Sequence, residues 1–585
     1  MNAKSMLYLL LTALLVVLTG CSTTRAPSAT ERDKTVQPQP TSPAAKMAGI
    51  VTPPPPPPVA ERQADAIALA APMPSGMQGR ASMAVQPAYG WQPPATQDRE
   101  HYAHYEDNPV QRVAEHPVST FGLDVDTGSY TNVRRMIEQG QLPPGDAVRA
   151  EEFINYFDYG YAPPKNRSQP FSVTTEVAPA PWNPKRQLLL VGVQGYRVPA
   201  QDIPAANLVF LIDTSGSMMS ADKLPLLKAS LRQVVPKLRH RDRVALVTYA
   251  GSAGIALPST PGDQHARILA AIDAMQPGGS TNGQAGIELA YAQARQGFIQ
   301  GGVNRVILAT DGDFNVGQTG IQALTDEIAD KRRSGIALST LGFGSGNYND
   351  AMAVRLADAG NGSHHYIDSL DEGRRVLVDE MAQTLLTIAK DVKVQIEFNP
   401  ARVSEYRLIG YVKRKLRRED FNNDQVDAGD IGAGANVTAL YEITPAGSSA
   451  ARIDPLRYAP QDRETRASSR EIAWLRLRYK QPEQTRSRLI ERPITDRDVH
   501  ARASQRMRFA AAVAAFADAL RGGKELDGYT LHDIAALARA ARGDDPRGDR
   551  AGFVRLVELA EGLQTAAATP PGADSGADRT ATMYR

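Results

Sequence analysis

One short stretch of the sequence places three oxygen donors directly behind a buried strand. Residues 207–212 read Asn-Leu-Val-Phe-Leu-Ile, and Asp213, Ser215 and Ser217 follow on a tight turn. Five consecutive apolar residues are typical of a central parallel strand, and open α/β sheets hold ligands at the carboxyl ends of such strands. Carboxylate and hydroxyl donors without His or Cys suit Mg²⁺ or Ca²⁺ rather than zinc or copper. One turn cannot fill an octahedral shell, so further ligands must come from elsewhere in the chain.

The segments after this turn alternate between helix and strand. The pattern predicts strands at 244–249, 303–309, 336–342 and 365–367, an antiparallel edge at 255–257, and helices at 224–238, 264–275, 284–296, 321–333, 351–359 and 370–390. Such alternation implies an α/β fold with a doubly wound, mostly parallel sheet. Thr281 and Asp311 each follow a buried segment, on loops that this fold gathers at the same edge as Asp213. The predicted metal site therefore consists of Asp213, Ser215, Ser217, Thr281 and Asp311.

These residues carry a resemblance to a known family. With the D-x-S-x-S turn at 213–217, then Thr281, then Asp311-Gly312, residues 205–390 resemble a von Willebrand factor type A (VWA) domain with a metal-ion-dependent adhesion site. The resemblance implies Mg²⁺ as cofactor, with Mn²⁺ or Ca²⁺ as alternatives, and an open coordination position that takes a partner's carboxylate. It also implies direct binding by the serines and commonly Thr281, with the two aspartates often acting through water. Hydroxyl ligands leave the ion more positive than carboxylates do, which favours an acidic group from outside.

A Mg²⁺-dependent periplasmic hydrolase is the alternative function. It requires a nucleophile and a base close to the ion. His364 and His365 are the nearest candidates in the sequence, but they adjoin a predicted strand and are interpreted as packing or solvent-facing residues. No P-loop pattern is present. We therefore expect a binding protein and not an enzyme.

The N-terminus has the pattern of a bacterial lipoprotein signal. Lys4 precedes an apolar run from Met6 to Leu18 that is too short for a comfortable membrane span. The next residues complete Leu-Thr-Gly-Cys, which resembles a lipobox and would make Cys21 the lipidated first residue of the mature protein. The alternative is an ordinary signal peptide with a chance cysteine. Ser22, in place of Asp, resembles an outer-membrane sorting signal, so we expect a lipid anchor in the outer membrane of a bacterium.

The rest of the chain is divided by composition and pattern. With 585 residues the chain is too long to fold around a single hydrophobic core, so several domains are expected. Its 66 basic and 64 acidic residues nearly balance, which gives no net positive charge that would favour binding to nucleic acid. Two strands precede the α/β unit with no helix between them, and they are expected to pair antiparallel with strands that follow the unit. The α/β unit would then be inserted into one β domain. The alternative is a separate C-terminal β domain. Thr127 or Ser129 is expected to cap a helix. The predicted segments are a signal peptide (1–20), a disordered Pro/Ala-rich tether (21–105), a helical flanking segment (106–165), the two strands (166–200), the VWA-like unit (205–390), an antiparallel β region (391–485), a helical region (500–565) and a disordered tail (566–585).

Together these features predict a cell-envelope lipoprotein. Its VWA-like domain is expected to bind a divalent cation and, through it, an acidic residue of an unidentified envelope or extracellular protein. The expected role is adhesion or envelope assembly. The mature chain resembles bacterial A-domain lipoproteins that have flanking N- and C-terminal domains of unknown function.

Overall fold

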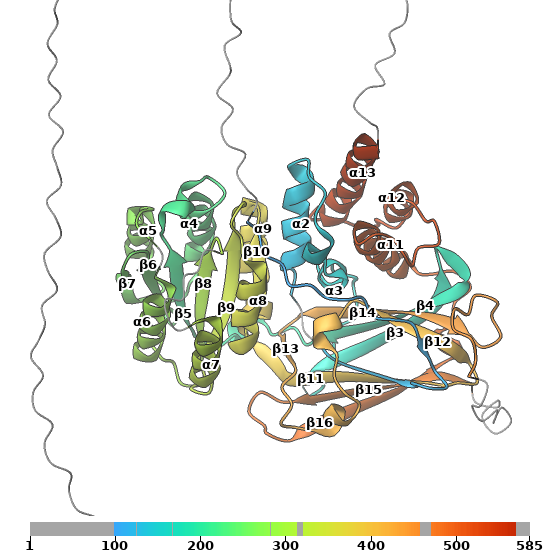
Figure 1. Cartoon of the computed structure of the whole chain (residues 1–585). Helices are drawn as coiled ribbons and strands as arrows, with labels where there is room; N and C mark the ends of the chain where they lie inside the picture. Colours follow the sequence, from blue (N-terminus) through green and yellow to red (C-terminus); the bar gives the residue numbers. More distant parts are fainter. Residues whose placement is uncertain are drawn as a thin grey trace, which may run out of the picture. The chain divides into compact units, whose positions relative to one another are not determined.

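The α/β unit contains a six-stranded sheet in the order β10-β9-β8-β5-β6-β7 (Figure 1). The computed structural model describes residues 99–123, 126–165, 168–280, 282–312, 320–456 and 470–568. All neighbouring strands of this sheet are parallel except the pair β6 and β7. The strands are β5 (Ala206–Asp213), β6 (Arg243–Tyr249), β7 (Ala253–Pro261), β8 (Val303–Thr310), β9 (Ala337–Phe343) and β10 (His364–Ile367). The predicted doubly wound sheet with one antiparallel edge is confirmed.

Helices cover both faces of this sheet because its central strands are apolar on both sides. In β5, Phe210 and Ile212 join one core, whereas Val209 and Leu211 join the other. The first face is covered by α4 (Leu224–Val234), α5 (His265–Ala274) and α9 (Leu370–Arg374), and the second by α6 (Gly283–Gln296), α7 (Gly320–Arg332) and α8 (Asp350–Ala359). In β5 this burial leaves polar side chains only at the ends of the strand, and the candidate site lies at one of these ends.

The β domain is built from strands on both sides of the α/β unit in the sequence. One sheet has the order β1-β12-β14-β4-β3, and the other has the order β13-β11-β15-β16 with β2 paired to β11. Leu190 of β4 pairs with Leu440 of β14, so the α/β unit is inserted into a single β domain. The strands are β1 (Gln111–Arg112), β2 (Val118–Gly122), β3 (Phe171–Ala180), β4 (Asn183–Gly195), β11 (Thr387–Phe398), β12 (Val403–Ile409), β13 (Gly429–Gly432), β14 (Asn436–Pro445), β15 (Glu471–Lys480) and β16 (Ser487–Thr495).

A separate core joins helices from both ends of the described chain. Phe157 contacts Phe509 and Phe553, at ring-centroid distances of 5.1 and 5.5 Å. The small alanine side chains on every face of α11 let other elements approach closely, and residues 509–517 are all buried. The helices are α2 (Gly128–Glu138), α3 (Ala150–Ile154), α11 (Gln505–Leu520), α12 (Leu531–Ala540) and α13 (Asp549–Ala568). None of the helices in the described ranges is both long and apolar enough to cross a bilayer.

Two local predictions are wrong. The helix expected at 370–390 is broken into α9, a π-helical turn at Arg375–Asp379 and α10 (Met381–Leu385), because the β-branched residues that follow pair as β11. Neither Thr127 nor Ser129 caps α2 through its side chain. Instead Glu152 of α3 accepts the backbone N–H of Ser129, at 2.8 Å, which puts a carboxylate at the positive end of the helix.

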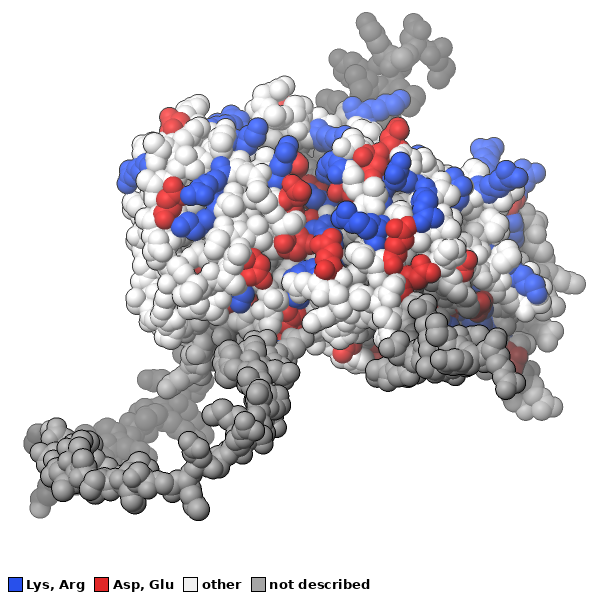
Figure 2. Space-filling view, turned by 90° about the horizontal axis from the view of Figure 1, so that it is seen from above, with Lys and Arg blue, Asp and Glu red and all other residues white. Residues whose placement is uncertain are grey.

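Several predictions concern residues outside the described ranges. They are the signal peptide, Cys21, the tether up to residue 98, Thr281 and the tail from residue 569. On the face drawn in Figure 2, basic and acidic side chains are interspersed, with no wide expanse of one sign. This agrees with the near balance of 66 basic and 64 acidic residues in the sequence.

Candidate metal centre

The turn after β5 holds its three oxygen donors close together. Asp213 is the last residue of β5 and is completely buried. Its Oδ1 accepts the backbone N–H of Ser215 at 2.8 Å, which fixes the turn around the carboxylate. The hydroxyl oxygens of Ser215 and Ser217 lie 3.0 Å apart. The structure therefore brings these three predicted ligands together.

The second carboxylate comes from the neighbouring strand. β5 and β8 are parallel, and Ile212 pairs with Ala309, so Asp213 and Asp311 leave the sheet at the same edge. Asp311 is also completely buried. Two buried carboxylates side by side repel each other and favour the binding of a cation between or beside them.

The electrostatics of Asp213 reflect this arrangement. Burial raises the pKa of Asp213 to about 6, hydrogen bonds from Ser215 oppose the rise, and the charge of Asp311 adds to it. The hydroxyls of Tyr249 and Thr310 donate to Asp213 Oδ2, at 3.2 and 3.4 Å. The carboxylate is thus held in one orientation from both sides, as expected of a group that orients a bound ion.

Thr281, the remaining predicted ligand, lies outside the described residues. The residues before it are hydrogen-bonded to the turn after β5. Gly216 N–H donates to Gly279 O at 3.1 Å, and Gly278 N–H donates to Thr214 O at 2.7 Å. The loop that leads to Thr281 is therefore fastened to the candidate site.

One residue of the site was missed by sequence reasoning. Lys223, whose side chain is 8 % exposed, donates from Nζ to Asp311 Oδ2 and to Asn347 Oδ1, both at 2.9 Å. A Cβ on Gly344, which has φ +71°, would lie 2.2 Å from Lys223 Cε, so glycine is required for the lysine to reach this position. A lysine immediately before a helix is electrostatically unfavourable there, and this was the available signal.

The donor set fits a hard divalent cation. Two carboxylates and two hydroxyls supply only oxygen, the ligand type of Mg²⁺, Mn²⁺ and Ca²⁺. An ammonium already lies against Asp311, which shows that this edge of the sheet attracts positive charge. Within the described ranges no group of three or more His, Cys, Asp or Glu residues is placed to hold a metal, and this site relies on hydroxyls instead.

The two histidines considered for catalysis make hydrogen bonds to other parts of the fold. His364 is hydrogen-bonded through its ring nitrogens to Thr340 and Tyr348, at 2.9 and 2.8 Å. His365 contacts Thr127 and Ser363, at 3.2 and 3.0 Å, and burial lowers its pKa to about 4. Both are buried, so the part of the prediction that had them packing inside the fold is correct.

Comparisons with known proteins match the part of the chain that contains this site. The family described as "von Willebrand factor type A domain" matches residues 207–376. The chain is 52 % identical over 469 residues to "Uncharacterized protein YfbK" of Escherichia coli strain K12, covering 79 % of this chain and 81 % of that protein. The chain belongs to the YfbK family. Consistent with this, "Uncharacterized protein YfbK, C-terminal" matches residues 383–563 and "von Willebrand factor" matches residues 96–190.

Other matches are more distant. Human "Inter-alpha-trypsin inhibitor heavy chain H3" is 26 % identical over 278 residues, which is 43 % of this chain and 30 % of that protein. The solved structure "von Willebrand factor type A from Catenulispora acidiphila" is 15 % identical, with a TM-score of 0.37 over 66 % of this chain and 89 % of that one. This YfbK-family protein thus has a VWA domain with flanking domains, and VWA domains commonly mediate metal-dependent protein interactions.

The Lys223 ammonium is expected to compete with the metal for Asp311. Lys223→Met removes the positive charge and leaves an unbranched side chain that is one heavy atom shorter. The affinity for Mg²⁺ should then rise by about tenfold, since two charges at about 4 Å interact by about 4 kcal/mol at intermediate dielectric and solvent offsets part of this. Isothermal titration calorimetry with Mg²⁺ and Mn²⁺ measures the change. Lys228→Met, a half-exposed lysine on α4, is the matched control. Weaker binding by Lys223→Met than by the control would contradict the competition.

The raised pKa of Asp213 predicts a pH-dependent stability of the metal-free protein. Its carboxyl group titrates near 3.8 when unperturbed and near 6 in the fold. Protonated Asp213 stabilises the fold below about pH 4, and this contribution is lost as the pH rises through 6. The total loss is roughly 3 kcal/mol, since a shift of one pKa unit corresponds to about 1.36 kcal/mol. Urea unfolding of chelator-treated protein should therefore show wild type losing stability relative to Asp213→Asn between about pH 4 and 7. A pH-independent difference between the two proteins would contradict this account.

Proposed function

We propose that the VWA domain binds Mg²⁺ through Asp213, Ser215, Ser217, Thr281 and Asp311 and, through the ion, a carboxylate of another envelope protein. The observation that supports this most is the burial of Asp213 and Asp311 beside two adjacent hydroxyls at the carboxyl edge of the sheet. When bound there, the ion supplies a positive charge that attracts an external carboxylate oxygen.

The residues around the site leave part of the positive charge of the ion available to a partner. Tyr249 and Thr310 hold one oxygen of Asp213, and the backbone of Ser215 holds the other. The serine hydroxyls add no negative charge. Lys223 offsets part of the charge of Asp311. The site as a whole therefore carries too little negative charge to neutralise a divalent cation, and the residual positive charge favours an acidic group of a partner.

We further propose that the protein acts from the envelope, held to the outer membrane by a lipid on Cys21, and that it is not an enzyme. The support is the Leu-Thr-Gly-Cys sequence with Ser22 after it, together with the hydrogen bonds of His364 and His365, which go to residues outside the candidate metal site. The partner is an unidentified envelope or extracellular protein with an exposed carboxylate, and the role is adhesion or assembly.

A pull-down from envelope extracts tests the binding function. Immobilised wild type with Mg²⁺ is compared with wild type in chelator, with Asp213→Ala and with Asp273→Ala, which removes an exposed carboxylate of α5. We expect partners to be retained by wild type in Mg²⁺ and by Asp273→Ala, and to be lost in the other two arms. Retention of the same partners in all four would overturn the proposal.

The hydrolase alternative has its own readout. Wild type and Asp213→Ala are incubated with phosphoester and peptide substrates in Mg²⁺ and in chelator. We expect no turnover in any of these conditions. Metal-dependent turnover that is lost in Asp213→Ala would support an enzyme in place of a binding protein.

A further inference from the structure

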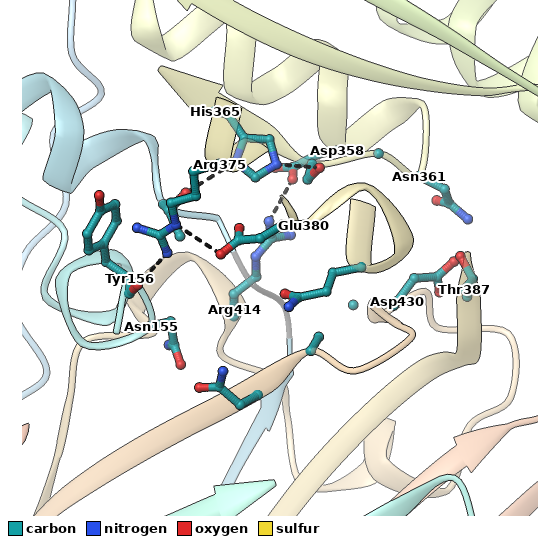
Figure 3. Close-up of a pocket in the computed structure, with 18 of the residues that line it drawn as sticks. Asn155, Tyr156, Asp358, Asn361, His365, Arg375, Glu380, Thr387, Arg414 and Asp430 are labelled. Atoms are coloured by element: carbon teal, nitrogen blue, oxygen red, sulfur yellow. Dashed lines mark hydrogen bonds and ion pairs between the residues drawn. The ribbon is translucent and has the colours of Figure 1, made fainter. Parts of the chain in front are cut away.

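A second polar site lies at the other end of the VWA sheet. A cavity of about 280 Å³ is lined by residues from the end of α8, the π-helical turn, α10, β13 and the segment around α3 (Figure 3). Arg305, which lines it, lies near the start of β8, whereas Asp311 follows the end of that strand. At about 3.3 Å per residue the two positions are roughly 20 Å apart, so the cavity is separate from the candidate metal centre.

Two arginines in the wall of this cavity keep unsatisfied donors. Arg305 and Arg375 are 5 % and 7 % exposed. Arg305 donates to Ser339 at 2.6 Å, but its Nε has no partner, and no carboxylate of the described residues lies within ion-pair distance of it. Burial lowers the pKa of Arg305 to about 10, and the charge of Asp430 only partly opposes this shift.

Arg375 is placed by the π-helical turn. The backbone N–H of Glu380 donates to the carbonyl of Arg375, at 2.8 Å, and closes the wide turn. The Arg375 guanidinium donates to Glu380 at 2.9 Å and to the carbonyl of Tyr156, and it stacks over the Tyr156 ring at 3.6 Å (Figure 3). One terminal nitrogen of Arg375 remains buried without a partner among the described residues.

The same cavity also has acceptors that are incompletely satisfied. Asp430 accepts one backbone N–H, from Asp391 at 3.2 Å, and no basic side chain of the described residues lies within ion-pair distance of it. Burial raises the pKa of Asp430 to about 7, and the charges of Asp391 and Asp427 contribute to the rise. The buried Oδ1 of Asn436 has no partner either. Figure 3 shows Asp430 and Arg375 on different walls of the cavity.

This combination selects the class of ligand. A buried donor or acceptor without a partner costs about 1–3 kcal/mol, and more if it is charged. A simple anion would satisfy the arginines but leave Asp430 and Asn436 unsatisfied, whereas a simple cation would face the arginines. A molecule with a carboxylate and an ammonium on separate atoms satisfies both walls. The volume is sufficient for a small organic molecule, since one water takes about 30 Å³ of liquid.

We propose that this cavity binds a small zwitterion, a free amino acid or a short peptide. Its carboxylate accepts from Arg305 and Arg375, and its ammonium donates to Asp430 and Asn436. The arginines and Asp430, which line the cavity, then lie next to groups of opposite charge. The site is independent of the metal centre and does not rest on the proposed function.

Calorimetric titration of the mature protein in chelator tests the ligand class. The probes are L-alanine and L-alanyl-L-alanine, their N-acetyl and C-amide derivatives, acetate and phosphate. We expect a zwitterion to bind, and removal of either charge to weaken binding by about tenfold or more, the loss typical of a hydrogen bond to a charged group. No binding of either zwitterion would overturn the proposal and leave a cavity filled by water. Equal binding of acetate or phosphate would overturn it in favour of a simple anion site.

Variants locate the binding in this cavity. Arg305→Gln and Asp430→Asn should each weaken zwitterion binding by about tenfold or more, whereas Arg295→Gln and Asp326→Asn, at exposed positions of α6 and α7, should not. In Asp430→Asn, the zwitterion with its free ammonium should no longer bind more tightly than its N-acetyl derivative. Circular dichroism checks the fold, and Arg305→Lys replaces Arg305→Gln if the latter does not fold. Unchanged affinity in folded Asp430→Asn would overturn the assignment.

Discussion

Arg149→Ala is expected to lower the free energy of unfolding by about 3–5 kcal/mol, the cost of removing one partner from a buried ion pair. The guanidinium lies between two carboxylates. It donates to both oxygens of Asp350, at 2.6 and 3.0 Å, and to Glu152. All three side chains are almost completely buried. The variant leaves two buried carboxylates without their shared cation, so the effect should be far larger than that of a surface ion pair.

The position of Arg149 explains why this substitution should destabilise the whole fold and not only one helix. Arg149 immediately precedes α3, whereas Asp350 begins α8 of the VWA domain, 201 residues later. Burial raises the pKa of Asp350, but the attraction of Arg149 outweighs this and holds that pKa well below its usual range. The ion pair therefore fastens the VWA domain to the helical segment before it. Without Arg149, burial shifts Asp350 toward its protonated form, and His364 is left to oppose this shift.

Urea unfolding at neutral pH measures this prediction. Arg232→Ala, which removes a half-exposed arginine paired with Asp273, is the control and should cost less than about 1 kcal/mol. Combining Arg149→Ala with Asp350→Asn should recover part of the loss, because the second change removes one uncompensated charge. A loss for Arg149→Ala no larger than that for Arg232→Ala would show that the buried network contributes little.

Cys21→Ser is expected to abolish lipid attachment and remove the protein from the outer-membrane fraction. Cys21 is the only cysteine of the sequence, so no other thiol can replace it. A single acyl chain gives marginal membrane binding, whereas several chains, at about 0.8 kcal/mol per buried CH₂, make the anchor effectively permanent. The expected effect is therefore nearly all-or-none.

Metabolic labelling with a fatty-acid analogue, followed by membrane fractionation, measures both parts of this prediction. Ser22→Asp is the matched control, because it keeps Cys21 and changes only the expected sorting signal. It should keep the label and shift the protein to the inner membrane. If Cys21→Ser still incorporated the label, the lipid would be attached elsewhere and the lipoprotein assignment would fail.

Most of the fold could be predicted because its signals are local. Runs such as 207–212 are apolar on both faces, and their alternation with amphipathic segments leaves few topologies other than a doubly wound sheet. The long helix expected at 370–390 shows the limit of this reasoning. Pairing of Thr387 and its neighbours with β13 and β15, which lie about 40 and 90 residues later, overrides the local preference.

The sequence by itself determined the donor atoms of the candidate metal centre. The types and order of Asp213, Ser215, Ser217 and Asp311 specify hard oxygen ligands, and strand polarity specifies that they share one edge. Only the tertiary structure decided which other charges act on them. Lys223 reaches Asp311 because Gly344 leaves room for its chain, and the cavity with Arg305 and Asp430 exists because the VWA domain is inserted between strands of the β domain. Such contacts form between segments that are far apart in the sequence. Local sequence patterns therefore do not predict them.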